Sequence, residues 1–171
     1  MIIELRPLNG AVIDEKEILL GMEKKEVEAL LGEGDESDCR AYYFDSAVCI
    51  EYDEEEKVDF IEVSCDEGER EINPVIYGIS VLKSDAKMVY DILKKMNRGR
   101  VEDVEKGYSY AFLNISVGVF REMTPDAYKE LEEEMEREGK PIHENPDLIA
   151  DLWKSTHWST VGIGTKGCYD L

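Results

Sequence analysis

The sequence predicts an α+β protein, in which an antiparallel sheet has helices packed mainly on one face. Three observations support this class. Short segments rich in aromatic and β-branched residues alternate apolar and polar positions, as strands with one buried face do. Amphipathic segments with apolar residues at helical spacing precede these strands. The order of helix and strands then occurs a second time, which favours two related helix–sheet units.

The first predicted helix lies in "GMEKKEVEALLGEG", residues 21–34. The apolar residues Met22, Val27, Leu30 and Leu31 recur at roughly helical spacing, and Gly32 supplies the left-handed residue that commonly ends a helix. So short a helix is marginally stable alone, because few hydrogen bonds offset the cost of nucleation. We therefore expect its apolar stripe to pack on the strands that follow.

Three strands are predicted next, at residues 41–45, 47–52 and 57–63. Asp45-Ser46 joins the first two tightly, and the acidic turn "DEEE" at 53–56 joins the second to the third. The alternation of apolar and polar residues in the second strand gives the sheet one apolar face and one face that is partly exposed to water.

The same order then recurs. Residues 75–82 are predicted to form a strand, and Ser84 is a candidate N-cap for a helix that continues to Met96. Two further strands are expected at 108–113 and 115–120. The two copies share their pattern rather than their residues.

A helical insertion at about 124–154 distinguishes the second copy. Thr124-Pro125-Asp126 is a strong helix start, because proline suits the first helical position, and a shorter helix is predicted to follow Asn145. Residues 157–164 return as a strand that we expect to pair with 115–120. The chain is thus predicted to be a single domain, 1–171, with repeat units 20–66 and 75–171.

"GMEKKEVEALLGE" followed by "YYF" and an alternating strand resembles the tandem helix–sheet units of the β-lactamase inhibitor protein fold. It also resembles the SmpA/OmlA domains, in which Gly-Met, Glu-Val and Leu-Leu-Gly occur on the same kind of helix before tyrosine-bearing strands. The likeness covers residues 20–63, and 84–120 by pattern alone. It implies a protein-binding scaffold, without a defined partner or functional residue.

Charge narrows the range of partners. The chain has 20 basic and 40 acidic residues, a net charge of −20, which repels nucleic acid and anionic membranes and attracts a basic protein. We expect no nucleic-acid or membrane partner, and a monomer. The N-terminal residues lack the basic and apolar regions of a signal peptide, and no apolar run reaches the length of a membrane span. We therefore expect a cytoplasmic protein with its four cysteines reduced.

No pattern typical of catalysis, metal binding or cofactor binding is present in the sequence, so we assign no catalytic residue, metal ligand or cofactor. His143 and His157, the two histidines, have no HExxH spacing, and the cysteines have no CxxC spacing. "VGIGTKG" at 161–167 lacks the order of a phosphate-binding loop. We interpret Gly162 and Gly164 as flat positions over which neighbouring aromatic rings lie.

Aromatic and acidic residues are the candidates for partner binding. Tyrosine suits a half-wet surface, because its hydroxyl stays hydrated, and interfaces favour tyrosine and tryptophan as anchors. If the helices cover one side of the sheet only, the other side is open. The predicted contact residues are Tyr42, Phe44, Asp53, Glu54, Glu55, Glu56, Tyr108, Tyr110 and Trp158.

The favoured function is therefore a cytoplasmic protein-binding module with an acidic, tyrosine-bearing face. An immunity or inhibitor protein that neutralises a basic toxin or enzyme fits this description. Two alternatives stay open. One is an enzyme with a dispersed site, built on His143 or His157 with nearby carboxylates, and the other is a structural or regulatory subunit that associates with itself.

Overall fold

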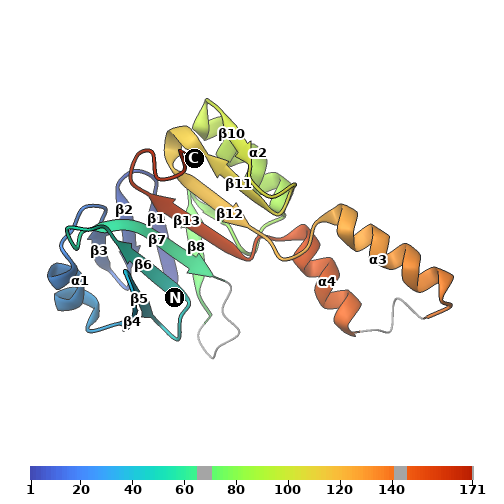
Figure 1. The fold of residues 1–171 in the computed structure, drawn as a ribbon, viewed down its shortest axis with the longest axis horizontal. Helices are drawn as coiled ribbons and strands as arrows, with labels where there is room; N and C mark the ends of the chain where they lie inside the picture. The colour runs from blue at the N-terminus through green and yellow to red at the C-terminus, as the bar shows by residue number, and fades with distance from the viewer. Residues whose placement is uncertain (65–70, 141–145, 171) are drawn as a thin grey trace.

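The computed structural model describes residues 1–64, 71–140 and 146–170. Within these residues, two sheets face each other and a pair of helices projects from one end (Figure 1). Both sheets are dominated by antiparallel pairing, and helices and strands contribute comparably. The predicted α+β class is confirmed.

The smaller sheet has five strands in the order β3-β2-β1-β8-β9. Their bounds are β1 Ile2–Arg6, β2 Gly10–Ile13, β3 Lys16–Leu19, β8 Asn73–Ile76 and β9 Ile79–Ser80. β1 pairs with β8 in parallel, whereas the other neighbours are antiparallel. Our sequence analysis assigned no strand to the first twenty residues, so most of this sheet was not foreseen.

The segment 75–82, predicted to be one strand, is divided. Tyr77 and Gly78 both have positive φ, 51° and 80°, and form a two-residue turn between β8 and β9. Positive φ at both central positions matches the twist of a hairpin, so the chain reverses here instead of extending. The prediction of a single strand is therefore wrong.

The larger sheet has eight strands in the order β10-β11-β12-β13-β7-β6-β5-β4. One meander comprises β4 Asp35–Ser37, β5 Arg40–Tyr43, β6 Val48–Tyr52 and β7 Val58–Ser64. The other comprises β10 Val101–Asp103, β11 Ser109–Phe112, β12 Val117–Phe120 and β13 Thr160–Gly164. The two meanders meet where β7 and β13 pair antiparallel. The predicted pairing of the last strand with 115–120 is confirmed by the register Val117–Ile163.

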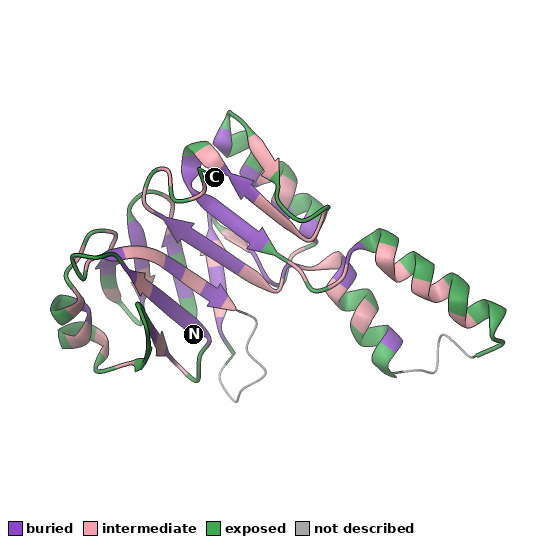
Figure 2. Ribbon diagram, viewed as in Figure 1, coloured by how far each residue is buried: buried purple, intermediate pink, exposed green. Residues whose placement is uncertain are grey.

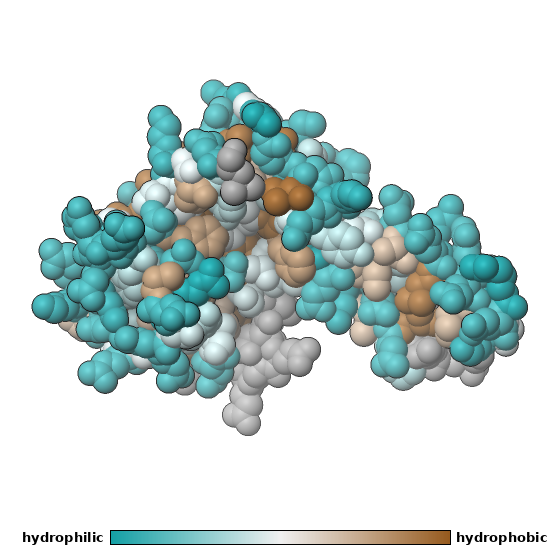
Figure 3. All heavy atoms as spheres, in the orientation of Figure 1, coloured by the Kyte–Doolittle hydropathy of each residue, from teal (hydrophilic) through white to brown (hydrophobic). Residues whose placement is uncertain are grey.

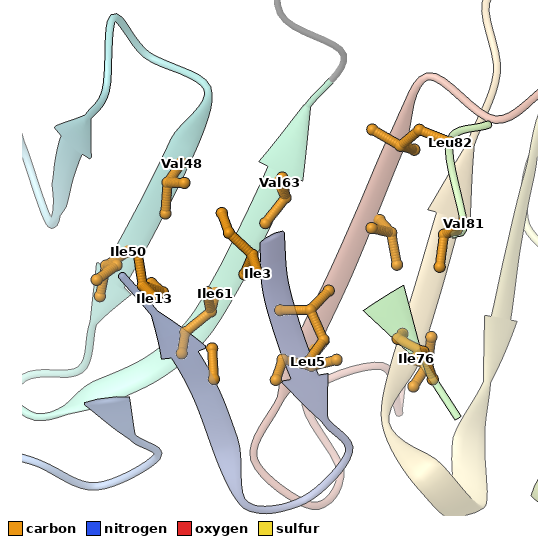
Figure 4. Packing of buried hydrophobic residues seen from close by; sticks show 14 of the residues in the cluster. Ile3, Leu5, Ile13, Val48, Ile50, Ile61, Val63, Ile76, Val81 and Leu82 are labelled. Carbon is orange, nitrogen blue, oxygen red and sulfur yellow. The ribbon is translucent and has the colours of Figure 1, made fainter. Parts of the chain in front are cut away.

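The core lies between the two sheets. Ile3, Leu5 and Ile13 of the smaller sheet face Ile50 and Ile61 of the larger one, and all five are at most 1% exposed (Figure 4). Each of these residues alternates with a more exposed neighbour along its strand, which is the period-two pattern of a half-buried sheet. Figure 2 shows that buried residues are concentrated in these strands.

Two helices flank this sandwich. α1 (Lys24–Leu31) ends at Gly32 as predicted, with φ 89°, and contacts β3. α2 (Ala86–Asn97) packs on β11 and on the short 3-10 helix η1 (Leu113–Ile115). Its N-cap is Asp85 rather than the predicted Ser84, because the Asp85 carboxylate accepts a hydrogen bond from the Met88 amide at 3.0 Å.

The inner face of the larger sheet is therefore covered mainly by a second sheet, with α2 over its β11 end. The expectation that helices form this covering layer is not confirmed. None of the helices in the described residues combines the length and apolar character that a membrane span requires.

The helical insertion predicted between the last two strands is present as α3 (Pro125–Arg137) and α4 (Pro146–Thr156). We call this pair the arm. Thr124 caps α3 as predicted, since its hydroxyl accepts a hydrogen bond from the Ala127 amide at 3.1 Å. The arm extends away from the sandwich (Figure 1).

Candidate functional site

The face of the eight-stranded sheet that points away from the smaller sheet is the outer face, and it is the candidate site. Strand alternation decides which residues lie on it. In β7 the side chains of Ile61 and Val63 are buried in the core, so Phe60 and Glu62 lie on the outer face. The strand register then places Cys49 and Gly162 on either side of Glu62.

Glycines form the floor of this face at the centre of the sheet. A Cβ atom at Gly162 would lie 2.2 Å from the Phe60 ring, and one at Gly118 would lie 2.2 Å from the Tyr169 hydroxyl oxygen. Both rings therefore lie directly over strands β13 and β12. The two ring centroids are 5.8 Å apart at 75°, an edge-to-face contact. The interpretation of Gly162 as a flat position beneath an aromatic ring is confirmed.

These rings border a shallow hollow of about 230 Å³. Phe60, Phe120 and Tyr169 supply aromatic surface, Gly118 and Gly162 contribute to the floor, and Glu62 contributes a carboxylate. In the view of Figure 3, apolar and weakly polar side chains gather over the middle of this sheet and hydrophilic side chains surround them. The hollow is thus an apolar, aromatic depression that contains an acidic group.

The Glu62 carboxylate makes no hydrogen bond or ion pair with another described residue. Burial raises its pKa above the ordinary value, the positive charge of Arg40 acts in the opposite direction, and Glu51 adds to the rise. Arg40 itself is bound by Glu51, whose Oε2 accepts from both Nε and Nη2 at 2.8 Å. The nearest basic group is therefore already paired, and Glu62 remains a half-buried carboxylate without a direct partner in the part of the chain described.

The thiols near the hollow are poor nucleophiles. Burial raises the pKa of Cys49 and of Cys168 to about 11, so both are protonated at neutral pH. His157 directly follows α4 and its ring stacks on Trp153, and His143 lies outside the described residues. Within residues 1–64, 71–140 and 146–170, no group of three acidic, cysteine or histidine side chains is arranged to hold a metal ion.

Some of the predicted contact residues lie at one side of the sheet. Tyr42 is half-buried on the outer face of β5, opposite Cys49 of β6. Phe44 lies in the following turn with φ 56° and packs partly against the core. The acidic turn 53–56 is exposed, and Asp53 orders it by accepting hydrogen bonds from the Glu55 and Lys57 amides at 2.9 Å.

Tyr110 and Trp158 lie on the inner side instead. Tyr110 contacts Tyr90 of α2 and Trp158, with ring centroids 4.9 and 5.9 Å away. Trp158 is 2% exposed, and its indole N–H donates to the Ala86 carbonyl at 3.0 Å. The alternation of β11 directs Ser109 to the outer face and Tyr110 to the inner face. The ring contacts of Tyr110 with Tyr90 and Trp158 therefore hold α2 against the sheet. Tyr108 is half-buried just before β11.

The residues that define the hollow were missed by the sequence analysis. The alternation in "VDFIEVS" contains a usable signal, because Phe60 and Glu62 must face away from the apolar Ile61 and Val63. Tyr169 had no such signal, since it follows the last strand and reaches the hollow only through the turn of residues 165–168.

Comparison of the chain with protein-family models, curated proteins and solved structures finds no match.

Proposed function

We propose that the chain is a protein-binding module whose outer face receives a basic segment of a partner protein. A lysine or arginine side chain of the partner lies in the hollow, with its aliphatic stem against Phe60 and Tyr169 and its cationic group at Glu62. Long basic side chains bury their stems on apolar surface in this way and keep the charge at a polar group. Aromatic faces next to the cation add to the attraction.

The observation that carries this proposal is the unpartnered, half-buried carboxylate of Glu62 in an aromatic hollow. Burial without a partner disfavours the charged carboxylate, as the raised pKa records. A cation bound beside the carboxylate removes that penalty. A basic ligand therefore gains binding free energy at this place that a neutral or acidic ligand does not gain.

The charge of the whole chain supports the same class of partner. A net charge of −20 accelerates the approach of a basic protein and makes the association sensitive to salt. An immunity or inhibitor protein that covers a basic toxin or enzyme would use such a surface. We also propose a cytoplasmic location, where free thiols such as Cys39, Cys49 and Cys168 persist. An enzyme with a dispersed site and a self-associating subunit stay as alternative predictions.

The test uses small blocked amino acids as probes and NMR spectroscopy of the labelled chain. N-acetyl-arginine N-methylamide and the lysine analogue are titrated into the protein, and the backbone amide signals of Gly118 and Gly162 are followed. We expect saturable shifts confined to the hollow. The norleucine analogue, which has an aliphatic stem without charge, should produce much weaker shifts.

Two variants distinguish binding at the hollow from attraction by the overall negative charge of the chain. Glu62→Gln should abolish the arginine-dependent shifts, whereas Glu54→Gln, in the exposed acidic turn, removes the same charge and should preserve them. Equal responses of the two variants would mean that only the overall charge attracts the probe. Equal shifts with norleucine would mean that the carboxylate has no role. Either result would overturn the proposal.

A further inference from the structure

The arm has an apolar stripe that the fold leaves exposed. Ile149, Leu152 and Trp153 of α4 are 58%, 46% and 53% exposed. Their spacing, i, i+3 and i+4, places them on one face of the helix. Leu148 and Ser155, in contrast, are the buried residues of α4. We call Ile149, Leu152 and Trp153 the arm stripe.

Contacts at the base of the arm do not involve the stripe. The Arg121 guanidinium donates to the Ser155 carbonyl at 3.1 Å and to the Gly107 carbonyl at 2.8 Å. Lys154 forms an ion pair with Glu122 at 2.6 Å. These polar contacts attach the C-terminal end of α4 to the body. The arm stripe makes none of these contacts, and no contact among the described residues accounts for its exposure.

The Trp153 ring is held in place before any partner arrives. It stacks on the His157 ring with a centroid distance of 3.4 Å and an interplanar angle of 10°. The His157 Nδ1 atom lies 3.1 Å from the Trp153 carbonyl oxygen, which fixes the second ring as well. Binding through an ordered side chain loses less conformational entropy. Tryptophan is also among the residues that most often dominate interface energies.

Charge identifies the partner that fits this stripe. The two arm helices carry eight carboxylates and three basic side chains. Apolar side chains on one face of a helix, in an arm whose two helices have a net charge of −5, are complementary to a helix with apolar residues on one face and lysine or arginine beside them. Figure 3 shows apolar side chains gathered on the arm among hydrophilic ones.

We propose that the arm stripe binds a basic amphipathic helix of a partner protein, which packs its apolar face on Ile149, Leu152 and Trp153. A second copy of the chain fits less well, because two arms would bring like charges together. This surface is separate from the outer face of the sheet, so the inference stands independently of the proposed function.

The probe is a designed peptide of leucine and lysine with helical amphipathic spacing, at physiological ionic strength. Trp153 reports its binding, because it is half exposed whereas Trp158, the other tryptophan, is buried. We expect a saturable blue shift of the fluorescence emission and protection of Trp153 from a soluble quencher. A peptide of the same composition in scrambled order, which cannot form an apolar face, should produce neither effect.

The decisive variant is Trp153→Ala, which leaves the charge of the chain unchanged. Measured by anisotropy of a labelled peptide, its affinity for the amphipathic peptide should fall about tenfold or more. Ile2→Ala is the matched control, because Ile2 is 68% exposed on the body and far from the arm in sequence. Circular dichroism of each variant checks that it is folded.

Three results would overturn the proposal. The first is an equal blue shift of the Trp153 emission with the scrambled peptide, which would mean that lysine charge alone drives binding at the arm. The second is unchanged affinity of Trp153→Ala. The third is a stable dimer in sedimentation equilibrium that Trp153→Ala dissociates, because the occupant would then be a second copy. The anisotropy measurements are made in a Glu62→Gln background, in which a peptide lysine finds no carboxylate at the hollow, so they report on the arm stripe alone.

Discussion

The body and the arm use their apolar residues in opposite ways. In the body, Ile3, Ile50 and Ile61 are fully buried between the two sheets. In the arm, α3 contains no buried residue, and Ile149, Leu152 and Trp153 of α4 are about half exposed. Figure 2 shows this contrast along the ribbon.

The contrast separates residues that hold the fold together from residues that are available to a partner. Burial of apolar surface is the dominant favourable term in folding, so the body supplies most of the stability. The arm, attached through polar contacts, contributes little to that term. The outer face of the sheet lies between these extremes, because its rings are packed on glycines and its carboxylate has no direct partner among the described residues.

The largest expected effect is in the body. Ile61→Ala removes a fully buried side chain from the central strand β7, and it should lower the free energy of unfolding by about 2–5 kcal/mol. Leu152→Ala, on the arm, should change it by less than about 0.5 kcal/mol. Urea unfolding of both variants measures the difference. Similar losses would mean that the arm stripe is part of the core.

A smaller loss is expected on the outer face. Gly162→Ala places a Cβ atom 2.2 Å from the Phe60 ring, and the resulting displacement should cost about 1–3 kcal/mol. The same substitution in a Phe60→Ala background should cost much less, because the ring that it meets is absent. Unfolding of the four members of this double-mutant cycle gives the coupling energy. A coupling of zero would show that the ring does not lie over the glycine.

Removing one helix cap from the body and one from the arm compares how each region contributes to global unfolding. Asp85→Ala removes the cap of α2 on the body, and Thr124→Ala removes the cap of α3 on the arm. Each loss destabilises its helix by about 1 kcal/mol. In the body, this should appear in the free energy of global unfolding. In the arm, it should appear instead as faster amide hydrogen exchange in α3, with global unfolding nearly unchanged.

The smallest effect concerns Glu62 and its pH dependence. Because burial raises the pKa of this carboxyl in the folded chain, the free energy of unfolding falls as pH rises from the pKa of an unfolded glutamate to the higher pKa of the folded chain. Glu62→Gln should therefore be slightly more stable than the native chain at neutral pH. The difference should disappear as pH falls below the pKa of an unfolded glutamate. Unfolding at several pH values, with Glu54→Gln as the control, measures it. A variant that is less stable at neutral pH would contradict the burial of this charge.

Local signals predicted much of the architecture. Thr124-Pro125-Asp126 begins α3 because proline and a capping hydroxyl favour a helix start in any context. Gly32 ends α1 for an equally local reason, whereas Gly162 lies beneath the ring of Phe60, a residue of the distant strand β7. The hairpin of β2 and β3 was missed because Asp14 and Glu15 adopt positive φ without the usual glycine.

The candidate site was harder to predict, because it depends on which face of the sheet is covered. Tyr110 was expected on an open face, but the smaller sheet and α2 cover the face to which it points. No local pattern indicates that residues 1–20 and 73–80 form that covering sheet. The approach of Tyr169 to Gly118 is likewise a contact between distant parts of the chain.

The most direct test of the proposed binding site is the pKa of the Glu62 carboxyl, measured by NMR in the free chain and with saturating N-acetyl-arginine N-methylamide. The proposal predicts a pKa above the ordinary glutamate value in the free chain and a clear fall when the guanidinium binds, since a nearby cation favours the carboxylate. A pKa that does not change with the probe would contradict the binding of basic side chains at this hollow.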